Sequence, residues 1–220
     1  PEREGRLRRS GWRGPPWLPG GAATLILLTS LESLGATPSY SAVDLARMAK
    51  EPGEIETVTS TKSDPVGKAG LWGLVAHFIV PYGCDDSYRV VRDIERYPER
   101  LKKVKRVVVQ KRLNNGLLTT YTENGLGFET TLTMLFTLEP RTRTLTSESV
   151  GKGDTRTWSQ TRLLDVGHPS YCQVKFIAFA DTRWIPKFVL NWGIPMALRT
   201  TASTYRDLIK IGLKASPPAA

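Results

Sequence analysis

The sequence predicts an α+β domain in which a long C-terminal helix covers one face of an antiparallel β-sheet. Three observations predict this class. Residues 128–138 alternate apolar and polar side chains, which is typical of a strand with one dry and one wet face. Asn-Asn-Gly at 114–116 and Asn-Gly at 124–125 are hairpin signals between short strand-like runs. Apolar residues recur at roughly helical spacing across 185–213.

The first predicted strand is followed by a helical hairpin. Residues 72–80 are apolar on both faces and lie between Gly70 and Pro81, which favours a buried strand. Acidic and hydroxyl side chains at 85–87 offer N-cap chemistry for an amphipathic helix. Tyr-Pro at 97–98 is expected to break that helix, so the segment should fold back on itself.

Six more strands are predicted, each bounded by a turn signal, and together with the first they give a seven-stranded antiparallel sheet. They cover residues 104–113, 117–122, 128–138, 143–150, 156–164 and 171–180. Pro195 lies inside the periodic pattern of the final helix and should kink or split it.

The chain is basic, and most of its excess charge lies in one segment. Its 220 residues include 31 Lys and Arg against 21 Asp and Glu, for a net charge of +10. The overall composition is ordinary for a globular protein and excludes collagen-like, coiled-coil and wholly disordered classes. Residues 89–112 alone carry ten basic and three acidic side chains. Such a run is most often a solvated helix face, but it also attracts anionic surfaces. The basic patch expected to face a membrane consists of Arg89, Arg92, Arg96, Arg100, Lys102 and Lys103.

The N-terminal segment, 1–42, is interpreted as an export signal or a disordered basic tail. It has an Arg-rich front, a short apolar stretch and small residues near Ala36. The folded domain is expected over 43–215 and a disordered tail over 216–220. An export signal would place the protein in the periplasm or outside the cell, and otherwise a cytoplasmic or membrane-peripheral location is expected. No apolar run approaches the roughly 18–20 residues of a spanning helix.

Cysteine and histidine are too few to predict a metal centre. Cys84 and Cys172 cannot alone make a self-contained zinc site, which needs four closely spaced ligands. His77 and His168 are far apart in sequence and have no acidic companion at helical spacing. No metal and no cofactor are therefore expected.

Three segments resemble the START-like (SRPBCC, helix-grip) superfamily, in particular its bacterial coenzyme-Q-binding and polyketide-cyclase-like members. They are DLARMAKEPGEIETV from Asp44, VVRDIERYPERLKKVKRVVV from Val90, and WIPKFVLNW from Trp184. The resemblance covers about 43–213 and contains no catalytic signature. It implies a helix-grip fold, in which a curved seven-stranded sheet wraps around the kinked C-terminal helix and leaves a deep cavity between them.

In such a fold the dry strand faces and the final helix would line a pocket for a hydrophobic ligand. The candidate lining residues are Tyr121, Leu132, Met134, Phe136, Trp158, Val174, Phe176, Phe188, Trp192 and Met196. The alternative is that these side chains simply fill a core, and the sequence does not separate the two.

The resemblance also implies that the first and last strands pair, which would bring Cys84 and Cys172 together. In an exported protein they could form a disulfide that closes a loop of almost ninety residues, worth on the order of 4 kcal/mol.

The first functional hypothesis is a carrier or sensor of a hydrophobic small molecule, such as a lipid, quinone or isoprenoid, docked by its basic patch on an anionic membrane. The second is a cyclase or aromatase acting on a polyketide in the same cavity. That chemistry needs a titratable group, for which the candidates are His77, Tyr121, Glu148 and Arg156. A protein-interaction module is a further alternative. Nucleic acid is not expected as a partner, since no recognition motif accompanies the basic segment. Oligomeric state leaves no signal in the sequence.

Overall fold

The computed structural model describes residues 40–51, 53–61, 63–64, 67, 70–125, 128–151, 157–181 and 187–215. At 55, 57, 125, 128 and 187–199 this description covers the backbone alone. The side chains of the predicted residues Phe188, Trp192 and Met196 therefore lie outside the described part. The segments 1–39 and 216–220 lie outside it entirely.

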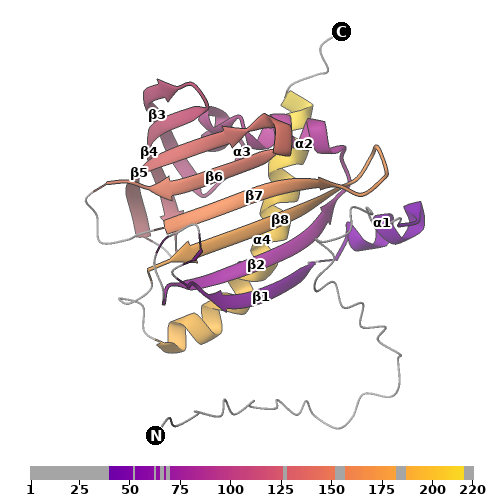
Figure 1. The fold of residues 1–220 in the computed structure, drawn as a ribbon, viewed down its shortest axis with the longest axis horizontal. Coiled ribbons are helices and arrows are strands. Elements are labelled where there is room, and N and C mark those ends of the chain that lie inside the picture. The colour runs from indigo at the N-terminus through magenta and orange to yellow at the C-terminus, as the bar shows by residue number, and fades with distance from the viewer. Residues whose placement is uncertain are drawn as a thin grey trace, which may run out of the picture. The chain divides into compact units, whose positions relative to one another are not determined.

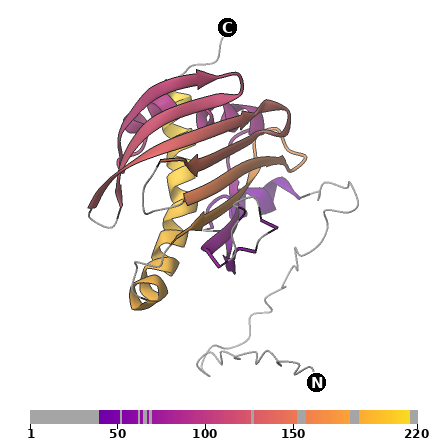
Figure 2. The ribbon, with the colours of Figure 1, turned by 60° about the vertical axis from the view of Figure 1, so that its left-hand side comes forward.

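A single antiparallel sheet of eight strands forms the body of the domain, in the order β1-β2-β8-β7-β6-β5-β4-β3. The strands are β1 (Glu54–Thr59), β2 (Trp72–Val80), β3 (Val104–Leu113), β4 (Gly116–Gly125), β5 (Phe128–Glu139), β6 (Thr144–Ser149), β7 (Thr157–Asp165) and β8 (Cys172–Ala180). Figures 1 and 2 show the sheet curving around the C-terminal helix α4 (Lys187–Ala215).

The predicted class is confirmed except for the strand count, because the structure contains eight strands and not seven. The added strand, β1, pairs with the outer edge of β2, from Glu54 opposite His77 to Thr59 opposite Trp72. Its sequence, EIETVT, carries two glutamates in six residues. Charged side chains are common on edge strands, where they discourage pairing with other chains. They also weaken the apolar alternation by which strands are detected in sequences.

The helical hairpin lies between β2 and β3, as predicted. It consists of α2 (Cys84–Val91), a 3-10 turn η1 (Ile94–Arg96) and α3 (Tyr97–Arg100). The acidic residues at 85 and 86 are not N-caps, because α2 begins at Cys84 with Gly83 at the cap position. They lie in the first turn, where negative charge interacts favourably with the helix dipole. Pro98 lies in the first turn of α3, where its missing N–H costs nothing.

The helix α4 lies against the concave face of the sheet and against α2. It is continuous from Lys187 to Ala215 and is not split at Pro195, although Figure 1 shows its first turns at an angle to the rest. A Cβ placed at Gly212 would lie 2.3 Å from Val90 Cγ1, so this glycine allows α2 and α4 to approach closely. No helix in the described ranges is long and apolar enough to cross a membrane.

The main core lies between the concave face of the sheet and the helices α2, α3 and α4. A smaller cluster joins Leu45 of α1 (Ala42–Met48) to Ile79 and Val166 on the other face of the sheet. Arg206 of α4 connects these regions, because its guanidinium donates to the carbonyl oxygens of Ile79 at 3.0 Å and Glu51 at 2.6 Å.

Candidate functional site

The concave face of the sheet and the helices α3 and α4 line a cavity of about 330 Å³. This volume is at the lower end of the range of roughly 300–1,000 Å³ that is usual for small-molecule pockets. Its lining residues are Tyr97, Leu101, Tyr121, Glu123, Leu132, Met134, Phe136, Leu145, Ser147, Thr157, Ser159, Thr161, Phe176, Thr204, Tyr205 and Leu208.

Five of the ten residues predicted from the sequence line this cavity: Tyr121, Leu132, Met134, Phe136 and Phe176. They lie on the inward faces of β4, β5 and β8, where the period-two alternation placed them. Val174 shares the inward face of β8 but is fully buried in the main core and does not border the cavity.

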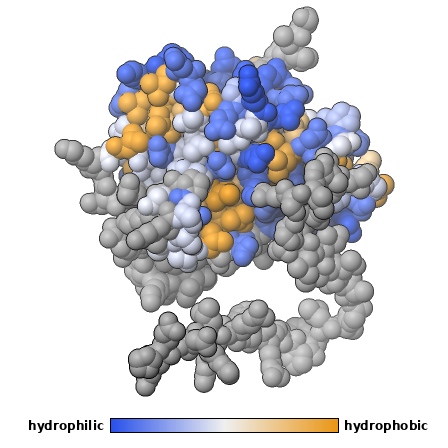
Figure 3. All heavy atoms as spheres, in the orientation of Figure 1, coloured by the Kyte–Doolittle hydropathy of each residue, from blue (hydrophilic) through white to orange (hydrophobic). Residues whose placement is uncertain are grey.

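The prediction for Trp158 is wrong. Its neighbours Thr157 and Ser159 line the cavity, and successive side chains of a strand point to opposite faces, so Trp158 points to the outer face of β7. There it is buried with Leu71 and Phe179, whose ring centroid lies 6.0 Å from that of Trp158. Figure 3 shows this outer side of the sheet as a mostly polar surface with separate apolar patches.

Hydroxyl groups outside the predicted set of lining residues form one part of the cavity wall. Ser147 of β6 and Ser159 of β7 are cross-strand partners, and their hydroxyl oxygens lie 2.7 Å apart. Thr161 of β7 shares a hydrogen bond with the Tyr205 hydroxyl of α4. The adjoining strands β4 and β5 contribute mainly apolar side chains together with Tyr121 and Glu123, so the serine and threonine hydroxyls are concentrated in one part of the lining.

Tyrosines and one carboxyl complete the polar lining. Burial raises the pKa of Tyr205 to about 12 and also raises the pKa of Tyr121, so both phenols are neutral at physiological pH. The Tyr97 hydroxyl donates to the carbonyl of Val91 at 2.5 Å. Burial raises the pKa of Glu123, while the positive charge of Lys103 offsets part of that increase.

Two of the four proton-transfer candidates lie outside the cavity. Tyr121 lines it, but His77 and Glu148 belong to the outward-facing positions of β2 and β6, since their neighbours Ala76 and Ser147 point inward. Arg156 lies outside the described residues. No group of three or more metal-ligating side chains occurs within the described ranges.

The structure corrects the predicted basic patch at Arg100. This side chain is only 2% exposed, and its guanidinium donates to Asp93 at 2.7 Å and to the Val90 carbonyl at 3.3 Å. The turn at 92–97 separates Arg100 from the face of α2, so spacing along a single helix does not place it. It is therefore a structural residue and not part of an exposed charged surface.

The other members of the patch are partly or fully exposed. Arg89 forms an ion pair with Asp86 at 3.0 Å, and Arg96 with Asp93 at 3.9 Å. Local carboxylates thus offset part of their charge. Arg92 lies over the Tyr88 ring, 5.9 Å from its centroid.

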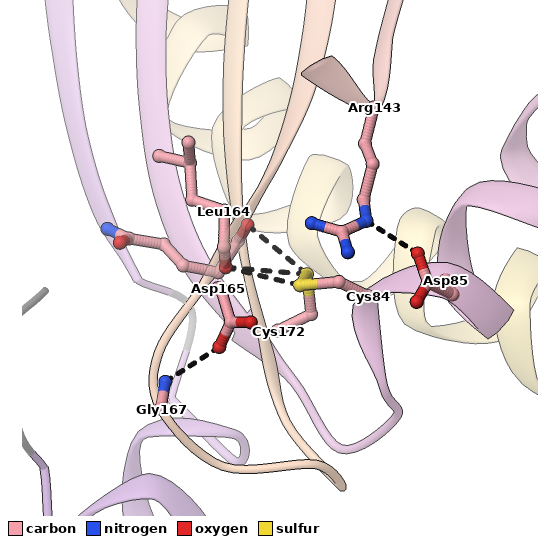
Figure 4. Close-up of a disulfide and its surroundings, with 8 residues drawn as sticks. Cys84, Asp85, Arg143, Leu164, Asp165, Gly167 and Cys172 are labelled. Carbon is pink, nitrogen blue, oxygen red and sulfur yellow. Dashed lines mark hydrogen bonds and ion pairs between the residues drawn. A yellow bond between two sulfur atoms is a disulfide. The ribbon is translucent and has the colours of Figure 1, made fainter. Parts of the chain in front are cut away.

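Cys84 and Cys172 form a disulfide that links the start of α2 to the start of β8, with Cα atoms 4.9 Å apart (Figure 4). The two sulfur atoms lie 3.2 Å and 3.5 Å from the carbonyl oxygen of Leu164. Beside them, Arg143 donates to Asp85 at 2.6 Å and lowers the pKa of that carboxyl.

No protein-family model matches the chain, and no curated protein matches it in sequence. Solved structures do resemble it. Human STARD10 aligns with a TM-score of 0.56 and 14% identity over 71% of this chain and 69% of its own. The Zhui aromatase/cyclase from Streptomyces sp. R1128 aligns with a TM-score of 0.54 and 12% identity over 74% and 98%.

A STAR-related lipid transfer protein from Xanthomonas axonopodis aligns with a TM-score of 0.51 and 15% identity, over 71% of this chain and 93% of its own. At these identities the comparisons concern the backbone arrangement alone.

Proposed function

Because the chain has a START-like fold, we propose that it binds one hydrophobic small molecule, such as a lipid, quinone or isoprenoid, between the sheet and α4. The observation that carries the proposal is the cavity of about 330 Å³ between the sheet and the helices α3 and α4. Protein interiors are normally packed with few voids larger than a water molecule. A cavity of this size with a largely apolar lining would gain free energy when an apolar ligand replaces the water in it.

The lining favours an apolar occupant that is oriented by a few polar groups. Leu132, Met134, Phe136 and Phe176 offer hydrocarbon and aromatic surface, whereas hydroxyl groups gather on the β6–β7 side. Such a combination of apolar area and few polar groups is usual in small-molecule sites.

We further propose that the protein takes up its ligand at an anionic membrane surface. Leu101 lines the cavity, and the next two residues, Lys102 and Lys103, are exposed. Basic residues near an anionic bilayer contribute about 1 kcal/mol each. Flotation with liposomes should therefore depend on anionic lipid and weaken in high salt. Binding that depends on neither anionic lipid nor salt would refute the proposed uptake at a membrane.

A cyclase-type enzyme is the second candidate, favoured by the carboxyl of Glu123 in the cavity lining. Burial raises the pKa of this carboxyl toward the range in which general acids and bases work. Incubation of the protein with a linear polyketide mimic should then convert the mimic to a cyclised product with loss of water. If the mimic is unchanged, the enzymatic function is refuted and ligand binding remains the proposed function.

The binding proposal is tested with Nile red, a neutral dye that fluoresces in apolar surroundings. The wild-type chain should bind it saturably at one site. Leu132→Trp places a large side chain into the cavity and should abolish binding. Leu135→Trp is the matched control, since Leu135 lies on the same strand but points to the opposite face.

If Leu132→Trp binds the dye as well as wild type does, the ligand site is elsewhere and the proposal falls. Circular dichroism on both variants would establish that each retains the fold.

A further inference from the structure

The charge of the cavity lining restricts the kind of ligand it can hold. Glu123 is the one Asp or Glu among the described lining residues, and no Lys, Arg or His belongs to them. An anionic head group bound inside would therefore meet a carboxylate without a compensating cation from this lining.

Glu123 lies on the inward face of β4, two residues from Tyr121. It is half-buried, and within the described part of the chain its carboxyl makes no hydrogen bond. The Tyr121 hydroxyl has no hydrogen-bond partner there either. Both groups are therefore free to hydrogen-bond to water or to a ligand in the cavity. A carboxylate accepts hydrogen bonds only, whereas a phenol can donate or accept one.

We propose that the ligand carries a non-anionic head group that donates a hydrogen bond, such as an alcohol or an amine, and that Glu123 selects against carboxylate and phosphate heads. The inference rests on the proposed binding function. A head group that donates would supply the hydrogen bond that Glu123 lacks. If the head group is an alcohol, its hydroxyl oxygen could also accept a hydrogen bond from Tyr121. An anionic head would place two like charges close together in a partly dehydrated space, which is unfavourable.

The charged and titratable groups near Glu123 on each neighbouring element support this selection. Tyr121 on β4, Tyr205 on α4 and Tyr97 on α3 are neutral phenols, because burial raises the pKa of each. Lys103, between α3 and β3, is exposed and near enough to act on the carboxyl electrostatically. Lys103 should therefore weaken the repulsion of an anion without removing it, because its ammonium remains hydrated.

The test compares three ligands with the same ten-carbon chain and different head groups: decan-1-ol, decylamine and decanoate. Each displaces Nile red from the full chain at pH 7.5, where decanoate is ionised. Decan-1-ol and decylamine should displace the dye at concentrations about ten-fold or more below that of decanoate. This comparison needs no variant, so it does not depend on a substitution that could disturb folding.

Glu123→Gln then assigns the selection to one side chain, because it removes the charge and keeps the shape. Decanoate should bind about ten-fold more tightly to this variant, and decan-1-ol should change by only a few-fold. Glu129→Gln is the matched control. It makes the same charge change on the next strand, at an exposed position that borders a groove on the outer face, and should leave the order of the ligands unchanged.

Equal displacement by decanoate and decan-1-ol in the wild type would overturn the inference and leave the binding function standing. An unaltered decanoate affinity in Glu123→Gln would likewise refute the role of this residue. Failure of all three ligands and of Nile red to bind would overturn the binding function and the inference together.

Discussion

The disulfide should contribute a large share of the stability of this domain. Cys84 and Cys172 are separated by 88 residues, and closing a loop of that length in the unfolded chain is worth about 4.6 kcal/mol at 25 °C in the chain-entropy model. Measured costs of removing native disulfides from small domains are about 2–5 kcal/mol. A typical domain is stable by only about 5–15 kcal/mol, so the bond would decide whether the fold survives moderate denaturant.

Urea titration of the oxidised protein, with and without a phosphine reductant, measures this contribution directly. Reduction removes the covalent link and leaves every other side chain in place, so it avoids the cavity that a substitution would create. We expect the free energy of unfolding to fall by about 4–5 kcal/mol on reduction.

The Cys84→Ala, Cys172→Ala double variant is the control, and its unfolding curve should not respond to the reductant. A wild-type protein whose unfolding curve is also unaffected by reductant would refute the reasoning, since the loop constraint would then contribute nothing. Mass spectrometry of the oxidised sample, with thiols alkylated, establishes that the bond was present at the start.

Three further predictions concern single residues and are read from urea titrations. Burial raises the pKa of Glu123 above its value in the unfolded chain, so ionisation of this carboxyl lowers the stability of the fold as the pH rises through its folded-state pKa. Glu123→Gln should therefore be more stable than wild type at pH 7. If the variant remained more stable below pH 4.5, the ordinary pKa of a glutamate, that result would contradict the argument. Arg100→Met breaks an ion pair of 2.7 Å whose arginine is buried, and it should lose about 1–3 kcal/mol. Arg96→Met, at an exposed pair of 3.9 Å, should lose less than about 0.5 kcal/mol. Gly212→Ala places a Cβ 2.3 Å from Val90 Cγ1 and should cost about 1–3 kcal/mol by forcing α2 and α4 apart; a stability equal to wild type would mean that this contact relaxes freely.

Periodicity predicted the apolar wall of the cavity because alternation along one strand is a local property. Met134 and Phe136 share a face in any regular strand, and the core must lie on that face. Trp158 is an apolar residue between two polar neighbours, Thr157 and Ser159, so alternation alone predicts that it faces inward. The structure reverses this expectation, because Thr157 and Ser159 line the cavity and Trp158 lies on the outer face.

The polar side of the cavity depends on contacts between distant segments. Ser147 and Ser159 meet through the register of β6 against β7, and Thr161 meets Tyr205 across 44 residues. Glu123, in contrast, follows Tyr121 by two residues on the same face of β4, and it was missed because the predicted strand ended at residue 122. The contacts of β6 with β7 and of β7 with α4 depend on tertiary structure, and no spacing in the sequence reports them.

Arg100 illustrates the same limit for charge. Four arginines at three- and four-residue spacing predict one continuous basic face, but the chain leaves the helix at Arg92 and restarts at Tyr97. The fourth arginine consequently turns inward and binds a carbonyl and a carboxylate.

The central claim is that the cavity between the sheet and α4 holds a hydrophobic small molecule. The most direct test is to purify the full chain from cells under native conditions, extract it with organic solvent and analyse the extract by mass spectrometry. Native mass spectrometry of the same sample gives the stoichiometry. The account predicts one hydrophobic molecule per chain, absent from Leu132→Trp and present in Leu135→Trp. A wild-type chain that is empty, and that stays empty after incubation with lipids, quinones and isoprenoids, would contradict it.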